Sequence, residues 1–113
     1  MKLLFVCSRN KWRSLTAEKI FQGVHGYDVR SAGTEAQARI KATAGHIGWA
    51  DVIFVMEKKH QRRLEDNFSD LLPQKKVVCL NISDDYLFMD RELIDLLVAT
   101  VSEHIDIPEM MPD

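Results

Sequence analysis

The sequence lacks the features that mark secreted, fibrous and membrane-spanning chains. Only two of its 113 residues are cysteines, which is too few for a disulfide scaffold. Its five glycines and three prolines are too few for a collagen or a disordered chain. No apolar run approaches the length of a transmembrane helix, and no Cys or His spacing is typical of a metal site. We therefore expect a cytoplasmic protein with no metal and no membrane partner.

The charge is small, with a formal net value of −2, so nucleic acid is not expected as a partner. The length suits one domain. We predict a single α/β domain over residues 1–106. A frayed C-terminal tail is expected over residues 107–113, which contain two prolines.

Short apolar runs alternate with segments of helical period, which is typical of βαβ units and a parallel sheet. The predicted strands are Lys2–Val6, Tyr27–Ser31, Asp51–Met56 and Lys76–Leu80. Helices are predicted around Ala17–Val24, behind Glu57 up to Pro73, and after an Asp90 N-cap, and a further one within residues 35–49.

The stretch Cys7-Ser8-Arg9-Asn10-Lys11-Trp12-Arg13-Ser14 joins the first strand to the first helix. Backbone N–H groups at a helix N-terminus, together with the helix dipole, bind anions and favour a thiolate. Cys7 is therefore a candidate nucleophile, and Arg13 can fork onto two phosphate oxygens. Ser14 can donate to the sulfur, and Asn10 tolerates a left-handed backbone. The alternative for Cys7 alone is a small buried hydrophobe.

These residues resemble the Cys-x-Gly-Asn-x-Cys-Arg-Ser motif of the low-molecular-weight protein tyrosine phosphatases. Later segments are similar in the same order. They are Ser31-Ala32-Gly33-Thr34, the strand Asp51–Met56, and Asp84-Asp85-Tyr86, which resembles the family's Asp-Pro-Tyr loop.

The resemblance implies a three-layer fold in which helices cover both faces of a four-stranded parallel sheet of order 2-1-3-4. It implies that Cys7 is the nucleophile, that Arg13 binds phosphate and that Asp84 is the general acid, with no cofactor. Asn10 with Ser31 would brace the loop by hydrogen bonds, and Tyr86, next to Asp85, would form part of an aromatic wall beside the substrate.

The sequence also departs from the family. Arg9 replaces a glycine, which costs about 1 kcal/mol if that position needs a positive φ. Trp12 replaces the second loop cysteine, and Asp85 replaces the proline of the acid loop. A histidine that braces the loop in the family has no counterpart near Gln37.

The basic residues after the third strand and Trp12 each allow two interpretations. The basic cluster Lys58, Lys59, His60, Arg62 and Arg63 could rim a site, although a solvated helix face is the favoured interpretation. Trp12 could stack on a substrate ring or pack in the core, whereas Cys79 and Trp49 are expected in the core.

The favoured function is hydrolysis of a phosphate monoester, with a phosphotyrosine protein or a small phosphoester as substrate, through a cysteinyl-phosphate intermediate. One alternative is a phosphate- or phosphopeptide-binding module with little turnover. A less favoured alternative is arsenate reduction, which in this family uses two further cysteines where only Cys79 is available.

Overall fold

The computed structural model describes residues 1–108, in which four parallel strands form one sheet. The strands are β1 (Lys2–Cys7), β2 (Asp28–Gly33), β3 (Val52–Val55) and β4 (Lys76–Cys79). Their order across the sheet is β2-β1-β3-β4. The predicted fold class and strand order are therefore confirmed.

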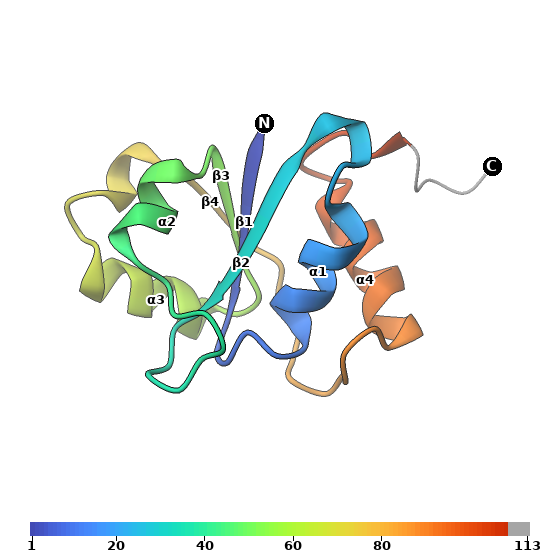
Figure 1. The fold of residues 1–113 in the computed structure, drawn as a ribbon, viewed down its shortest axis with the longest axis horizontal. Helices are drawn as coiled ribbons and strands as arrows, with labels where there is room; N and C mark the ends of the chain where they lie inside the picture. The colour runs from blue at the N-terminus through green and yellow to red at the C-terminus, as the bar shows by residue number, and fades with distance from the viewer. Residues whose placement is uncertain (109–113) are drawn as a thin grey trace.

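Among the residues described, four α-helices cover the two faces of the sheet, as expected for a parallel sheet buried on both sides. They are α1 (Arg13–Phe21), α2 (Ala44–Trp49), α3 (Lys58–Asn67) and α4 (Arg91–Val101). Figure 1 shows α1 and α4 on one side of the sheet and α2 and α3 on the other. Short 3₁₀ helices occur at Val24–Gly26 and Leu72–Gln74. No helix among residues 1–108 is long and apolar enough to cross a membrane.

The central strand β1 divides the apolar core in two. Leu3 and Phe5 belong to the cluster under α1 and α4, whereas Leu4 and Val6 belong to the cluster under α2 and α3. Phe5 stacks on Phe21, with ring centroids 5.5 Å apart. Burial on both faces explains why β1 has no polar alternation, and it fixes the position of the residue that ends the strand, Cys7.

The helix predicted within residues 35–49 is shorter than expected, because only Ala44–Trp49 is helical. Backbone N–H groups before it pair elsewhere. The N–H of Glu35 donates to Ser8 O and that of Arg39 to Arg9 O, both at 2.9 Å. Residues 34–41 therefore form a loop that is held against the segment after β1.

The C-terminal helix agrees with its predicted start, since the Asp90 side chain accepts a hydrogen bond from the N–H of Glu92 at 2.9 Å. The frayed tail is predicted to start at residue 107, but the structure holds that residue in place. Ile107 is only 1% exposed and lies in the apolar core, and the Tyr27 hydroxyl donates to Asp106 O at 2.5 Å. The rest of that tail, from residue 109 on, lies outside the described residues.

Candidate active site

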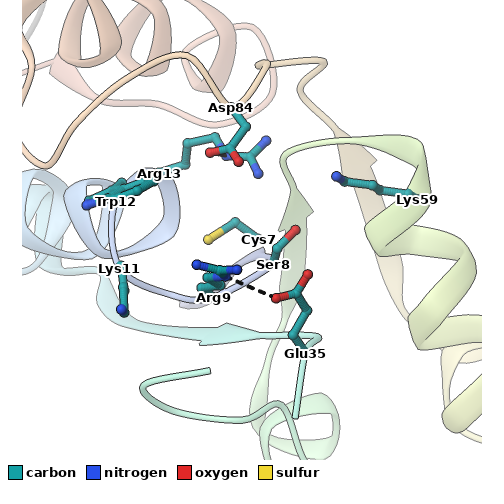
Figure 2. A pocket seen from close by; sticks show the side chains of 9 residues that line it. All are labelled: Cys7, Ser8, Arg9, Lys11, Trp12, Arg13, Glu35, Lys59 and Asp84. Carbon is teal, nitrogen blue, oxygen red and sulfur yellow. Dashed lines mark hydrogen bonds and ion pairs between the residues drawn. The ribbon is translucent and has the colours of Figure 1, made fainter. Parts of the chain in front are cut away.

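A cavity of about 240 Å³ opens at the carboxyl end of β1, where parallel sheets commonly place their ligands. Its lining residues are Cys7, Ser8, Arg9, Lys11, Trp12, Arg13, Glu35, Lys59 and Asp84 (Figure 2). The structure thus brings the three predicted catalytic residues, Cys7, Arg13 and Asp84, to one cavity.

The thiol of Cys7 is paired with the hydroxyl of Ser14. Cys7 is buried, and its Sγ lies 2.9 Å from Ser14 Oγ. Ser14 Oγ accepts a hydrogen bond from Asn10 Nδ2 at 2.7 Å, while the Ala32 carbonyl is more distant at 3.4 Å. With the amide donating to its oxygen, Ser14 is free to direct its proton to the sulfur, where it would stabilise a thiolate.

The backbone of the loop adopts the conformation that its sequence allows. Asn10 has a φ of 58°, in the left-handed region that asparagine tolerates. Arg9 does not share it, since the non-glycine residues of positive φ in residues 1–108 are Asn10, His25, Asn81 and Met89. The arginine that replaces the family's glycine therefore brings no left-handed strain.

The loop is braced from one side by the segment that follows β2. Gly33 is in close contact with it, because a Cβ added there would lie 2.6 Å from Ser8 O and 2.6 Å from Ala38 Cβ. Arg39 Nε donates to Asn10 O at 3.2 Å, and Arg9 Nε pairs with Glu35 Oε2 at 3.3 Å. The turn around the cavity is thus held by backbone and side-chain contacts.

The guanidinium of Arg13 is buried and held at one nitrogen. Nη1 donates to a carboxylate oxygen of Glu57 and, at 2.8 Å, to Ile82 O. Nε lies 3.7 Å from Asp84 Oδ1. Because Nη1 donates both hydrogen bonds, the Nε and Nη2 groups form the edge that can donate a bidentate pair of hydrogen bonds to an anion.

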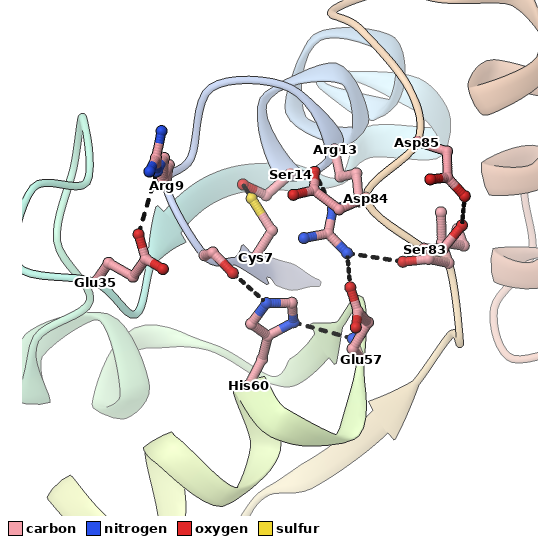
Figure 3. A network of polar contacts seen from close by, with 12 residues as sticks. Cys7, Arg9, Arg13, Ser14, Glu35, Glu57, His60, Ser83, Asp84 and Asp85 are labelled. Carbon is pink, nitrogen blue, oxygen red and sulfur yellow. Dashed lines mark hydrogen bonds and ion pairs between the residues drawn. The ribbon is translucent and has the colours of Figure 1, made fainter.

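The two neighbouring aspartates differ in direction. Asp84 lines the cavity and is half-exposed, whereas Asp85 accepts a hydrogen bond from Ser83 Oγ at 2.5 Å. Figure 3 shows Asp85 turned toward Ser83 and away from Cys7. The geometry therefore favours Asp84 over Asp85 as a proton donor to a group in the cavity.

Two supporting residues are placed differently from the prediction. Ser31 Oγ donates to Glu18 Oε1 at 2.6 Å, so it ties β2 to α1 and is not the partner of Asn10. Tyr86 packs against the core cluster under α1 and α4 and is not among the residues that line the cavity. The aromatic ring at the cavity is that of Trp12, which is 37% exposed.

Sequence reasoning missed the roles of Glu57 and His60. Glu57 is the N-cap of α3, and its carboxylate holds Arg13. Burial by itself would raise the pKa of Glu57, but the hydrogen bond and charge of Arg13, with Lys59 and His60, bring that pKa below its usual value. His60, predicted to share a solvated face, is only 1% exposed. The available signal was the three-residue spacing between Glu57 and His60, which is that of a capping box.

The mouth of the cavity carries more positive than negative charge. Arg9, Lys11 and Lys59 line it together with Arg13, against Glu35 and Asp84. The basic cluster at the start of α3 is therefore divided, because Lys59 faces the cavity while His60 is buried. This balance favours anionic ligands.

The molecule is thus a three-layer α/β protein whose cysteine and arginine loop closes over the end of the central strand. The same fold occurs in the low molecular weight protein tyrosine phosphatase from Streptococcus pyogenes, with a TM-score of 0.71, 16% identity and 93% of each chain covered.

Two further solved structures are similar. The drosophila arginine phosphatase has a TM-score of 0.63 and 23% identity, with 91% of this chain and 92% of that chain covered. The tyrosine phosphatase Wzb from Escherichia coli, solved with phosphate, has a TM-score of 0.68 and 19% identity, with 90% and 94% covered. No protein-family model and no curated protein matches the sequence. At these identities the likeness establishes the fold.

Proposed function

We propose that the protein hydrolyses phosphate monoesters through a cysteinyl-phosphate intermediate on Cys7. The observation that carries the proposal is the convergence of Cys7, Arg13 and Asp84 on one cavity of about 240 Å³. A nucleophile, a fork for phosphoryl oxygens and a carboxyl group are the three parts that this two-step reaction requires. The phosphatases of the same fold support the proposal.

In the first step the Cys7 thiolate attacks phosphorus in line with the leaving oxygen. The S–P bond forms as the P–O bond to the leaving group breaks, and Asp84 in its protonated form gives its proton to that oxygen. In the second step water attacks phosphorus, Asp84 accepts a proton from the water, and the S–P bond breaks. Inorganic phosphate leaves and the thiolate is restored.

The cradle for the phosphoryl group combines backbone and side chain. The N-cap of α1 is Trp12, whose side chain makes no capping hydrogen bond, so the first-turn N–H groups remain available to a ligand. Arg13 adds its Nε and Nη2 donors and a full positive charge. Glu57 holds that guanidinium in place, so little reorganisation is needed as charge develops.

The preferred substrate class is an aryl phosphate, with phosphotyrosine as the protein-borne example. Trp12 supplies an exposed aromatic face at the cavity. Phosphoarginine is the competing substrate suggested by the arginine phosphatase of the same fold. Its guanidinium leaving group would meet the cationic Arg9, Lys11 and Lys59, which disfavours it.

The test is turnover of para-nitrophenyl phosphate, a phosphotyrosine peptide and a phosphoarginine peptide by wild type and Cys7→Ser. We expect wild type to cleave the two aryl esters and Cys7→Ser to be inactive, because a serine hydroxyl is scarcely ionised near neutral pH. Rapid quenching should trap phosphate on Cys7. Full activity of Cys7→Ser would refute the mechanism, and faster cleavage of phosphoarginine would overturn the substrate class.

The role of Asp84 can be separated from that of Asp85 by leaving-group dependence. Asp84→Ala should slow a tyrosyl ester by roughly 10²-fold and an ester of an acidic phenol much less, since only a basic leaving oxygen needs a proton. Asp85→Ala is the matched control and should show no such dependence. The opposite pattern would move the acid by one residue.

The two other candidate functions make different predictions. A binding module would retain orthovanadate affinity without turnover, and this outcome would replace the enzyme proposal. Arsenate reduction lacks structural support, because Cys79 lies on β4 and β3 separates that strand from β1.

A further inference from the structure

The first turn of α3 contacts the loop of residues 7–14, called the cysteine loop below, at two points. Glu57, its N-cap, binds Arg13, and His60, three residues later, lies 2.9 Å through Nε2 from Ser8 Oγ. Figure 3 shows His60 and Glu57 side by side below the loop. One helix terminus thus meets both the guanidinium and the residue that follows Cys7.

The tautomer of His60 follows from its partners. The backbone N–H of Glu57 donates to Nδ1 at 3.0 Å, so Nδ1 is the unprotonated nitrogen. Nε2 then carries the proton and donates it to Ser8 Oγ. Burial and the charges of Arg13 and Lys59, opposed by Glu57, lower the pKa of His60 to about 4. The imidazole is therefore neutral near physiological pH, and this tautomer persists.

This contact determines the direction in which the hydroxyl of Ser8 can donate its proton. A hydroxyl has one proton, and the Nε2–H of His60 occupies the direction that points to the imidazole. Ser8 lines the cavity beside Cys7 and Arg13, so its own proton can be donated on the cavity side.

We infer that His60 is a positioning residue, which holds Ser8 Oγ as an acceptor and so aims the Ser8 proton at a phosphoryl oxygen of the substrate. The inference rests on the proposed function, because it takes the ligand of the cavity to be a phosphoryl group. His60 itself does not touch the substrate. Its effect on the reaction passes through Ser8.

Two substitutions separate this role from helix capping. In His60→Asn the side chain ends near the position of Nδ1, so it can accept from the Glu57 N–H but cannot reach Ser8. In His60→Gln the amide nitrogen extends near the position of Nε2, so it can donate to Ser8 but leaves the cap unpaired.

His46 provides the matched control. It accepts a hydrogen bond from the Thr43 N–H through Nδ1 at 3.1 Å, in the same capping arrangement at the start of α2, and it does not line the cavity. His46→Asn and His46→Gln therefore report the effect of a capping change alone.

The measurements are inorganic phosphate affinity by calorimetry, kcat and KM for para-nitrophenyl phosphate, and the thermal midpoint of unfolding. Loss of one hydrogen bond to a charged oxygen corresponds to about 10-fold in affinity. His60→Asn and Ser8→Ala should each weaken phosphate binding by about 10-fold. His60→Gln should recover most of that loss, and the double variant Ser8→Ala/His60→Asn should be no worse than Ser8→Ala.

Several results would overturn the inference. Phosphate affinity that is retained in His60→Asn and lost in His60→Gln would assign His60 to the cap alone, as would a loss in both variants that follows the thermal midpoint in the way the His46 variants do. Additive losses in the double variant would show that His60 does not act through Ser8. Phosphate binding does not require turnover, so an inactive wild type would end the proposed function while the affinity pattern still decides this one.

Discussion

The pH dependence of stability offers a direct test of the neutral His60. Folding lowers the pKa of this group from 6.5 to about 4, mainly by burial and then by the charge of Arg13. As the pH falls below 6.5, the unfolded chain binds a proton that the folded protein does not. The free energy of unfolding therefore decreases as the pH is lowered from the upper to the lower of these two pKa values, and it levels off below the lower one.

The magnitude follows from linkage between the two pKa values. Going from about pH 7 to about pH 5, this histidine should remove about 2 kcal/mol of unfolding free energy, and the full difference approaches about 3 kcal/mol near pH 4. That is a large part of the stability of a small domain.

The assay is urea unfolding of wild type and His60→Gln across this pH range. Glutamine does not titrate, so the variant should lack the decrease of about 2 kcal/mol, although it can be less stable at every pH through its weaker cap. His46, whose pKa is also lowered, by burial and Arg30, contributes equally to both proteins and cancels in the difference. A difference between the two proteins that stays constant from pH 7 to pH 5 would refute the assigned protonation state.

Three further perturbations test the rest of the site. Gly33→Ala should destabilise the protein by about 1–3 kcal/mol in urea unfolding, because its Cβ would lie 2.6 Å from Ser8 O; a neutral effect would contradict the close approach. Arg13→Lys should lose at least about 10-fold in kcat/KM, since an ammonium cannot form the two-pronged contact, and unchanged kinetics would argue against the fork. Peroxide should oxidise Cys7 without forming a Cys7–Cys79 bridge, because β3 separates their strands and places the two residues about 10 Å apart; a dominant bridge by mass spectrometry would contradict the strand order.

Much of the fold could be predicted because its signals are local. The uninterrupted apolar run of β1 indicates burial on both faces, and Asp90 marks the start of α4 in the sequence as in the structure. The alanine-rich composition of residues 35–49 predicts a helix, of which only Ala44–Trp49 forms. The backbone N–H groups of Glu35 and Arg39 donate instead to the cysteine loop, which is a tertiary contact that composition does not record.

The candidate site could be predicted in part for the same reason. The sequence motif brings Cys7, Asn10, Arg13 and Ser14 together within one loop, so their contacts are nearly local. Contacts between segments that are distant in the sequence could not be predicted from it. His60 lies within a basic run that suggests a solvated face, and its burial depends on how α3 packs against the residue after Cys7.

The position of Cys7 at the end of the central strand has a consequence for motion within the site. β1 is hydrogen-bonded to a neighbour on each side, so exposing its amides to exchange with solvent requires opening most of the sheet. Asp84 lies instead on an irregular segment beyond β4 and is half-exposed. We expect amide hydrogen exchange to be slowest along β1 and fast around Asp84, so that a rigid anion cradle is served by a carboxyl group that samples several positions.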